Sequence, residues 1–149
     1  MFAERKSIRK YKSDEVPEEL IKQVVEAARV APSAKNRQPW RFISFSEKAK
    51  EELLDAMGKG IEKQKKNPFM PKKFKQGMVS ADNTLRIMRE APVIVIVINT
   101  LSNDPLKSVS YGKRISEIHN SLSIGAAIEN MLLKATELGL GSLWIGNTV

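Results

Sequence analysis

The sequence contains no cysteine and only one histidine among its 149 residues. The lack of cysteine excludes disulfide scaffolds, thiol nucleophiles and thiolate metal sites, and one histidine leaves no His-rich metal cluster. The longest apolar run, residues 91–98, is far shorter than the ~20 residues that a membrane-spanning helix needs. The first five residues contain no apolar signal core. These absences predict a cytoplasmic protein with no metal site and no membrane partner.

The chain has the length and composition of one ordinary globular domain. Hydrophobic residues make up 42% and charged residues 28% of the sequence, which argues against a disordered or fibrous protein. There are 25 Lys+Arg against 17 Asp+Glu, a net charge of +8. Such a surplus favours an anionic partner, and nucleic acid, a membrane surface and a phosphorylated small molecule all satisfy it.

Hydrophobic spacing predicts helices separated by three strands. The segment 93–98 is apolar at every position, which predicts a strand covered on both faces in the middle of a sheet. Strands separated by helices are typical of an α/β or α+β layer structure. The other predicted strands are 41–45 and 140–146. The predicted helices are 17–31, a helix after Ser46 that frays near Gly58 or Gly60, a short helix over 79–90, and a long helix over 115–135 that Gly139 ends.

The segment 59–75 contains seven lysines, with Pro68 and Pro71 between them. Such a segment is too charged and too interrupted to bury a face of its own, so we expect it to be exposed and mobile. Its charge suits either NAD(P)H or nucleic acid. Nucleic-acid modules usually interleave aromatic with basic residues, and this segment holds only Phe69 and Phe74. We therefore rank a nucleic-acid function below an enzymatic one.

Two segments carry residues suited to ligand binding. The segment Arg5–Arg9 places two arginines four residues apart around the hydroxyl of Ser7, an arrangement that holds a phosphate or a ring edge; a solvated basic face is the alternative. The loop Pro32–Trp40 presents Ser33, Asn36 and Gln38 between prolines, and proline stiffening lowers the entropic cost of presenting them to a ligand. A rigid turn between a helix and a strand is the alternative there.

These segments give the chain its resemblance to a known family. Arg5, Ser7 and Arg9 match an early R-x-S-x-R/K segment, and the loop from Pro32 to Trp40 matches P-S-x-x-N-x-Q-P-W in full. A long helix then leads into Gly139-Leu140-Gly141 and a strand. With the three features in this order, the sequence resembles the FMN-dependent nitroreductases.

The resemblance implies a single domain, residues 1–149, with an α+β sandwich fold. A central mixed sheet is flanked by helices, and the long helix lies at the interface of a homodimer that holds FMN at its seam. Family members continue past the last strand into a C-terminal arm. Because this chain stops at Val149, we expect that arm to be absent and the last strand to lack a neighbour. The residues implied to bind the cofactor are Arg5, Lys6, Ser7 and Arg9 from one subunit, Pro32, Ser33, Ala34 and Asn36 from its partner, and Trp144, Ile145 and Gly146 beside the ring.

The activity implied is that of an FMN-dependent NAD(P)H oxidoreductase. NAD(P)H reduces the flavin at N5 and leaves, and a nitroaromatic, quinone or similar small molecule then takes the electrons. No side chain is implied as an obligate acid, and Arg9 tunes the flavin by stabilising negative charge near N1/O2. Reductive dehalogenation and flavin breakdown on the same fold are the alternatives, because no residue of the sequence decides the acceptor.

Overall fold

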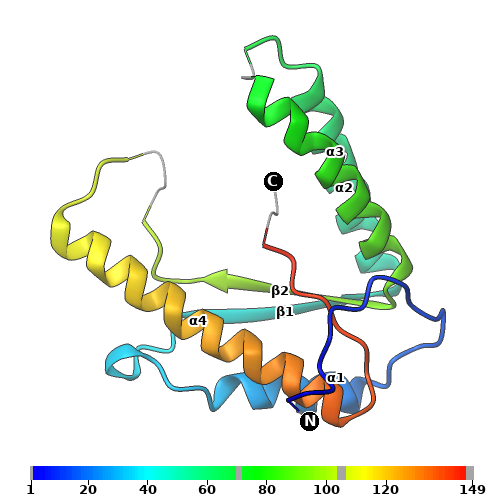
Figure 1. Cartoon of the computed structure of the whole chain (residues 1–149), viewed down its shortest axis with the longest axis vertical. Helices are drawn as coiled ribbons and strands as arrows, with labels where there is room; N and C mark the ends of the chain where they lie inside the picture. The colour runs from blue at the N-terminus through cyan, green and yellow to red at the C-terminus, as the bar shows by residue number, and fades with distance from the viewer. Residues whose placement is uncertain (1, 70–71, 104–106, 147–149) are drawn as a thin grey trace.

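The computed structural model describes residues 2–69, 72–103 and 107–146, and of residues 72–79 it describes only the backbone. The described chain combines α-helices with a small antiparallel sheet (Figure 1), so the predicted α+β class is confirmed. The elements in chain order are α1 (Glu18–Arg29), the 3₁₀ turn η1 (Ala34–Asn36), β1 (Trp40–Ser46), α2 (Glu47–Lys65), α3 (Lys72–Glu90), β2 (Val93–Asn99) and α4 (Tyr111–Glu137).

The sheet consists of β1 and β2, paired antiparallel from Trp40 opposite Asn99 to Ser46 opposite Val93. Alternate residues of β2 face opposite layers: Val95 and Val97 pack toward one hydrophobic cluster, and Ile94 and Ile96 belong to another. The prediction that this strand is covered on both faces is therefore confirmed. Its predicted place in the middle of the sheet is wrong for the described residues, where β1 is its one hydrogen-bonded neighbour.

The predicted strand 140–146 is also wrong. Of its residues only Ser142 forms a bridge, parallel to Ser7, and the Ile8 N–H donates to the Ser142 carbonyl at 2.9 Å. The remainder of 140–146 makes no ladder with another described strand. The segment resembles a strand in sequence because β-favouring residues follow Gly139-Leu140-Gly141. Among the described residues, however, no long partner strand lies beside it.

Helices α1 and α4 pack on one face of the sheet and, with it, form what we call the body (Figure 1). Ala28 of α1 and Ala127 of α4 are fully buried, and small residues let two helices approach closely. Asn130 Nδ2 donates to the Ala27 carbonyl at 3.0 Å, which adds a polar tie between the helices. Helix α4 ends as predicted: Gly139 has φ +75° and the Leu140 N–H donates to the Ala135 carbonyl at 2.8 Å, a Schellman motif.

Helices α2 and α3 form an antiparallel hairpin that extends away from the other face of the sheet (Figure 1). The prediction that the first of these helices frays near Gly58 or Gly60 is wrong, because α2 continues to Lys65. The predicted helix 79–90 is longer as well and begins at Lys72. A Cβ on Gly58 would meet the Leu85 side chain at 3.4 Å. Close packing against α3 therefore outweighs the cost of about 1 kcal/mol that glycine brings to a helix.

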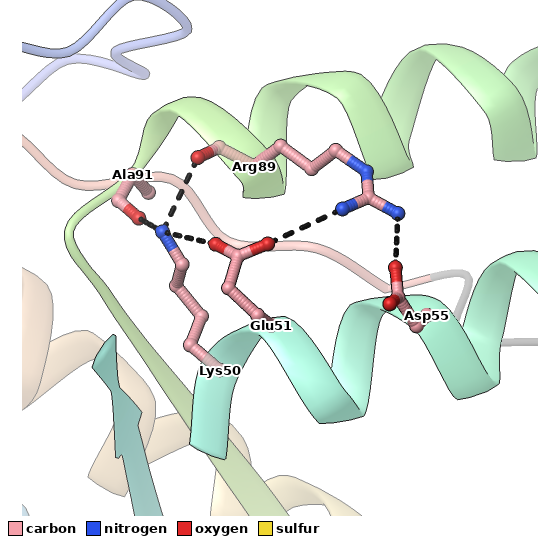
Figure 2. Close-up of polar contacts among 5 residues, drawn as sticks. All are labelled: Lys50, Glu51, Asp55, Arg89 and Ala91. Atoms are coloured by element: carbon pink, nitrogen blue, oxygen red, sulfur yellow. Dashed lines mark hydrogen bonds and ion pairs between the residues drawn. The ribbon is translucent and has the colours of Figure 1, made fainter. Parts of the chain in front are cut away.

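A polar network fixes the base of this α2/α3 hairpin (Figure 2). Lys50 is buried, and its Nζ donates to the carbonyls of Arg89 at 3.3 Å and Ala91 at 3.1 Å and pairs with Glu51 at 3.3 Å. The Arg89 guanidinium pairs with Glu51 at 3.4 Å and with Asp55 at 2.9 Å. Lys50 thereby satisfies carbonyls at the end of α3 that have no partner inside the helix.

Candidate functional site

The N-terminal segment Arg5–Arg9 lies beside the segment that follows α4. The bridge between Ser7 and Ser142 joins them, and the contact is close: a Cβ on Gly141 would lie 3.1 Å from the Ile8 side chain. A larger residue at position 141 would push the Ile8 side chain away by a few tenths of an ångström, so glycine suits this close approach. The structure thus brings together two of the three segments that the sequence singled out.

Cationic and hydroxyl groups of this N-terminal segment are available to a ligand. Lys6, Ser7 and Arg9 are exposed, whereas Arg5 is half-buried with its Nε 4.0 Å from a carboxylate oxygen of Glu129. Among the described residues, no carboxylate forms an ion pair with Lys6 or Arg9. Uncompensated cations next to a hydroxyl are suited to binding a phosphate.

Tyr11 supports the backbone of the same segment. Its hydroxyl donates to the Ile8 carbonyl at 2.8 Å. Burial raises the pKa of the Tyr11 phenol above its ordinary value, and the positive charge of Arg9 acts in the opposite direction. The phenol is therefore protonated and able to donate at neutral pH.

The segment Trp144–Gly146 runs from α4 to the base of the hairpin. The Trp144 indole comes within 3.8 Å of the position of a Cβ on Gly125 of α4, yet the side chain is 49% exposed. Ile145 packs against the cluster formed by Leu54, Met88 and Ile94. Gly146 is exposed. An exposed indole next to extended backbone offers a flat ligand a surface on which to stack.

The Pro32–Trp40 loop is fixed by hydrogen bonds to itself and to α4. Ser33 Oγ accepts from the Gln38 N–H at 3.0 Å, and Gln38 Nε2 donates to Asn36 Oδ1 at 3.3 Å. The Ala34 N–H donates to Ser123 Oγ at 3.1 Å, and Ser123 Oγ in turn donates to the carbonyl of His119 at 2.7 Å. Pro39 is fully buried, whereas Pro32 and Asn36 are exposed. The loop is therefore anchored at its end and exposed at its turn.

Backbone strain is concentrated in this loop. Lys35, Asn36 and Gln38 have φ of +56°, +51° and +48°, in the left-handed region that costs a residue other than glycine about 1–3 kcal/mol. Such strain persists only where the surrounding structure enforces it, and it clusters at ligand sites. The strain makes this loop a candidate ligand-binding segment.

The N-terminal segment and the loop attach to different parts of α4. Arg5 reaches Glu129, whereas Ala34 is bound to Ser123. Six residues separate these attachment points, a rise of about 9 Å along the helix. In this chain, no described hydrogen bond or ion pair joins residues 5–9 to residues 32–38.

Two features of α4 were missed by the reasoning from sequence. The first is a pair of polar residues: Ser123 binds the loop at Ala34, and Glu129 lies beside Arg5. In the sequence, only their polarity within a largely apolar helix could have indicated this role. The second is a hollow of about 810 Å³ beside Trp144, where Ile118 is 48% and Leu122 68% exposed. Ile118 and Leu122 lie one helical turn apart, which makes this face of α4 a candidate interaction surface.

The fold and this arrangement define a class: an α+β protein in which an exposed cationic N-terminal segment and a strained, proline-bounded loop attach to different parts of one long helix. The profile of the Nitroreductase family matches residues 2–148. The chain belongs to the Nitroreductase family.

Relatives of known sequence agree with this assignment. The chain is 31% identical over 142 residues to a protein of Methanothermobacter thermautotrophicus provisionally named NADH dehydrogenase/NAD(P)H nitroreductase, covering 95% of this chain and 56% of that protein. It is 28% identical to the iodotyrosine deiodinase of Hydra vulgaris, covering 93% of this chain and 54% of that protein. The chain thus spans little more than half the length of these two relatives.

Solved structures give the same result. A BluB-like flavoprotein from Clostridium difficile 630 is 28% identical with a TM-score of 0.69, covering 99% of this chain and 73% of that one. A nitroreductase with bound FMN from Bacteroides fragilis is 25% identical with a TM-score of 0.63, covering 97% and 66%. Over the described part of the chain, no helix is long and apolar enough to cross a membrane, and no group of three or more His, Asp or Glu is placed to hold a metal ion.

Proposed function

We propose that this chain forms the flavin-binding part of an FMN-dependent NAD(P)H oxidoreductase. The observation that carries the proposal is the bridge between Ser7 and Ser142, which holds the segment of the exposed Lys6, Ser7 and Arg9 against the chain that leads into Trp144–Gly146. An anionic, flat and polar cofactor matches both halves of this surface. The Bacteroides fragilis relative with bound FMN supports the choice of flavin.

The N-terminal segment would hold the phosphate, ribityl chain and pyrimidine side of FMN. Arg5, Lys6 and Ser7 supply two charges and a hydroxyl, and Arg9 supplies the cation near N1/O2, where negative charge collects on reduction. The residues fit this group because Lys6 and Arg9 have no competing carboxylate among the described residues. Arg5 Nε lies 4.0 Å from a Glu129 carboxylate oxygen, so the charge that Arg5 would offer is balanced in part within the chain.

Trp144, Ile145 and Gly146 would lie along the ring. Ile145 is anchored in the cluster at the hairpin base, which fixes the backbone on either side of it. Gly146, with no side chain, leaves its N–H open to approach by a ring nitrogen. The Trp144 side chain then limits one edge of the space that the ring occupies.

The second half of the site would come from a partner subunit in a homodimer. Pro32, Ser33, Ala34 and Asn36 of the partner's loop are held in an enforced conformation, so presenting them costs little further entropy. The exposed apolar residues Ile118 and Leu122 of α4 lie on the helix that would form the interface. Closure of this interface would also shield the ring from water.

When bound, FMN supplies hydride chemistry, accepting two electrons from NAD(P)H and passing them to a small acceptor such as a nitroaromatic or a quinone. The residues of this chain bind and orient the flavin, tune it through Arg9 and leave one ring face open to the two substrates in turn. Reductive dehalogenation remains the alternative for the acceptor, because the Hydra relative carries the name iodotyrosine deiodinase.

The absorbance spectrum of the purified chain, alone and after addition of FMN and removal of the excess, tests the proposal. We expect flavin bands that NAD(P)H bleaches in the absence of air. Arg9→Ala should weaken FMN binding and lower its reduction potential. Lys12→Ala removes an exposed cation three residues beyond this segment and should change neither. A chain that retains no FMN, or an Arg9→Ala variant that matches Lys12→Ala, would contradict it.

A further inference from the structure

The turn between α2 and α3 carries an exposed aromatic residue that the flavin site does not use. Phe69 is 91% exposed, and among the described residues it is the one large apolar side chain exposed on the hairpin. Figure 1 shows this turn at one end of the longest axis of the molecule, away from the sheet and from α4. A scattered exposed apolar residue is ordinary at a protein surface, so the meaning of Phe69 depends on what surrounds it.

Hydrogen bonds hold Phe69 in an ordered turn. Its N–H donates to Asn67 Oδ1 at 3.0 Å, and the Asn67 N–H donates to the Gln64 carbonyl at 3.0 Å. Asn67 Nδ2 also donates to Gln64 Oε1 at 3.4 Å. Asn67 thus links the turn to the end of α2. Because the backbone of Phe69 is already fixed, insertion of its ring into an apolar phase costs less conformational entropy.

The chain around this turn is positively charged. Residues 63–81 contain six lysines and no Asp or Glu. At the end of α2, Lys63 and Lys66 are exposed, and no carboxylate in the described part of the chain forms an ion pair with either of them. Lys65, which lies between them, is paired with two acids. We call the exposed, unpaired Lys63 and Lys66 together with Phe69 the hairpin tip.

Helix stability does not account for this charge. Lysines in the last turn of α2 lie at the negative end of the helix dipole, where they are favourable. On the other side of the turn, α3 begins with Lys72-Lys73 and has no acidic residue in its first turn. Positive charge at that end opposes the helix dipole. An anionic surface beside the hairpin tip would compensate the lysines of both helices.

The partner that fits the hairpin tip is an anionic lipid surface. A protein interface commonly buries about 800 Å² on each side around a cluster of aromatic or apolar anchors, whereas the described part of the hairpin exposes a single such side chain. A bilayer needs no matching shape. Its interface accepts an aromatic ring, while lysines on flexible stems approach the lipid phosphates.

We propose that the hairpin tip docks this chain on anionic membranes, with the Phe69 ring inserted at the lipid interface and Lys63 and Lys66 on the lipid phosphates. The inference goes beyond the proposed flavin function and does not rest on it. It also differs from the prediction of no membrane partner made from the sequence. That prediction depended on the lack of a membrane-spanning segment, and docking at the surface needs none.

The test is cosedimentation of the purified full chain with vesicles of phosphatidylcholine alone and of phosphatidylcholine mixed with phosphatidylglycerol. We expect binding to the mixed vesicles only, and weaker binding as salt screens the charges. The double variant K63Q/K66Q should lose at least about tenfold in affinity, because each lysine near an anionic surface contributes about fivefold. The matched control K22Q/K48Q removes two exposed cations outside the hairpin tip and should stay within about twofold, because charges beyond a Debye length of the surface are screened.

The ring is tested at constant charge. Phe69→Ala should lower the affinity for mixed vesicles by about tenfold, because the ring no longer leaves water. Val30→Ala, at a residue of the body that is 74% exposed, should leave the affinity unchanged. Phe69→Trp should keep the binding, and its fluorescence should shift to shorter wavelength on addition of mixed vesicles, beyond any shift of the parent chain.

Three results would overturn the proposal: no binding to mixed vesicles, equal loss in the two double variants, and binding that Phe69→Ala leaves unchanged. In the last case the lysines adsorb to any polyanion, and a random oligonucleotide should compete with the vesicles. The FMN content of each variant is measured separately. Retained FMN without vesicle binding refutes this inference alone, whereas vesicle binding without FMN refutes the flavin function and leaves the membrane surface standing.

Discussion

Helices α1 and α4 of the body cover one face of the two strands, and the α2/α3 hairpin covers the other face. The packing inside these two regions differs. In the body, small residues such as Ala28, Ala31 and Ala127 are buried between α1, α4 and the sheet. In the hairpin, larger apolar residues form two small clusters, and ion pairs such as Lys65 with Asp82 and Arg89 with Asp55 lie at the surface. Close backbone packing fixes positions, whereas exposed ion pairs contribute only about 0–1 kcal/mol each.

This difference matches the place of the proposed flavin site. The flavin needs groups held in fixed positions, and its candidate residues lie on backbone that the body constrains. The hairpin, by contrast, meets the sheet mainly through α2. The difference also predicts which substitutions affect the whole molecule and which affect one region.

The largest effect is expected at the junction of the two regions. Leu54 is fully buried between α2, α3, β2 and Ile145. Leu54→Ala should reduce the free energy of unfolding by about 3 kcal/mol, because it removes buried methyl groups and leaves a cavity. Denaturant unfolding measures this loss, and Leu101→Ala, at a residue that is 48% exposed, should stay within about 0.5 kcal/mol of the parent. Equal effects of the two substitutions would show that the junction is not packed as described.

The sequence predicted the body better than the hairpin for a physical reason. The period of α1, the Schellman end of α4 at Gly139 and the apolar run of β2 are local signals, and each led to the right element. The hairpin depends on contacts distant in sequence: Gly58 stays helical because Leu85 of α3 packs beside it. Proline and lysine between the two helices concealed that partnership.

The candidate site shows the same limit. Its motifs Arg5–Arg9 and Pro32–Trp40 were recognisable because their residue types carry the chemistry. Ser123 and Glu129 were not recognisable from the sequence. A serine or glutamate within a long helix gives no sign of a binding role until its partner on another segment is known. The third predicted strand failed because pairing needs a neighbour, and within the described part of the chain 140–146 pairs only at Ser142, with Ser7.

A smaller and more local effect is expected at the base of the hairpin. Lys50→Met keeps an unbranched side chain of similar length but removes the ammonium that donates to the Arg89 and Ala91 carbonyls (Figure 2). Leaving these carbonyls without their donor should cost about 1–3 kcal/mol. Hydrogen exchange should show faster opening of the α3 end and of the start of β2, with little change in α1 and α4. Lys48→Met is the control, and faster exchange throughout the body would contradict the separation of the two regions.

The smallest effect is expected in the body, at a position that serves the loop rather than the core. Ser123→Ala removes the acceptor of the Ala34 N–H and should cost about 1 kcal/mol. The reason is that one hydrogen bond is lost while the apolar cluster around Ala127 is left intact. The exchange rate of the Ala34 amide, measured by NMR, should rise about fivefold, and FMN affinity should fall if the strained turn of the loop is part of the flavin site.

Thr136→Ala removes a comparable hydroxyl of α4 that donates to the Leu132 carbonyl, and it should leave both measurements unchanged. A Ser123→Ala variant whose Ala34 amide remains as protected as in the parent would show that the loop keeps its conformation without α4, and that its strain has another origin.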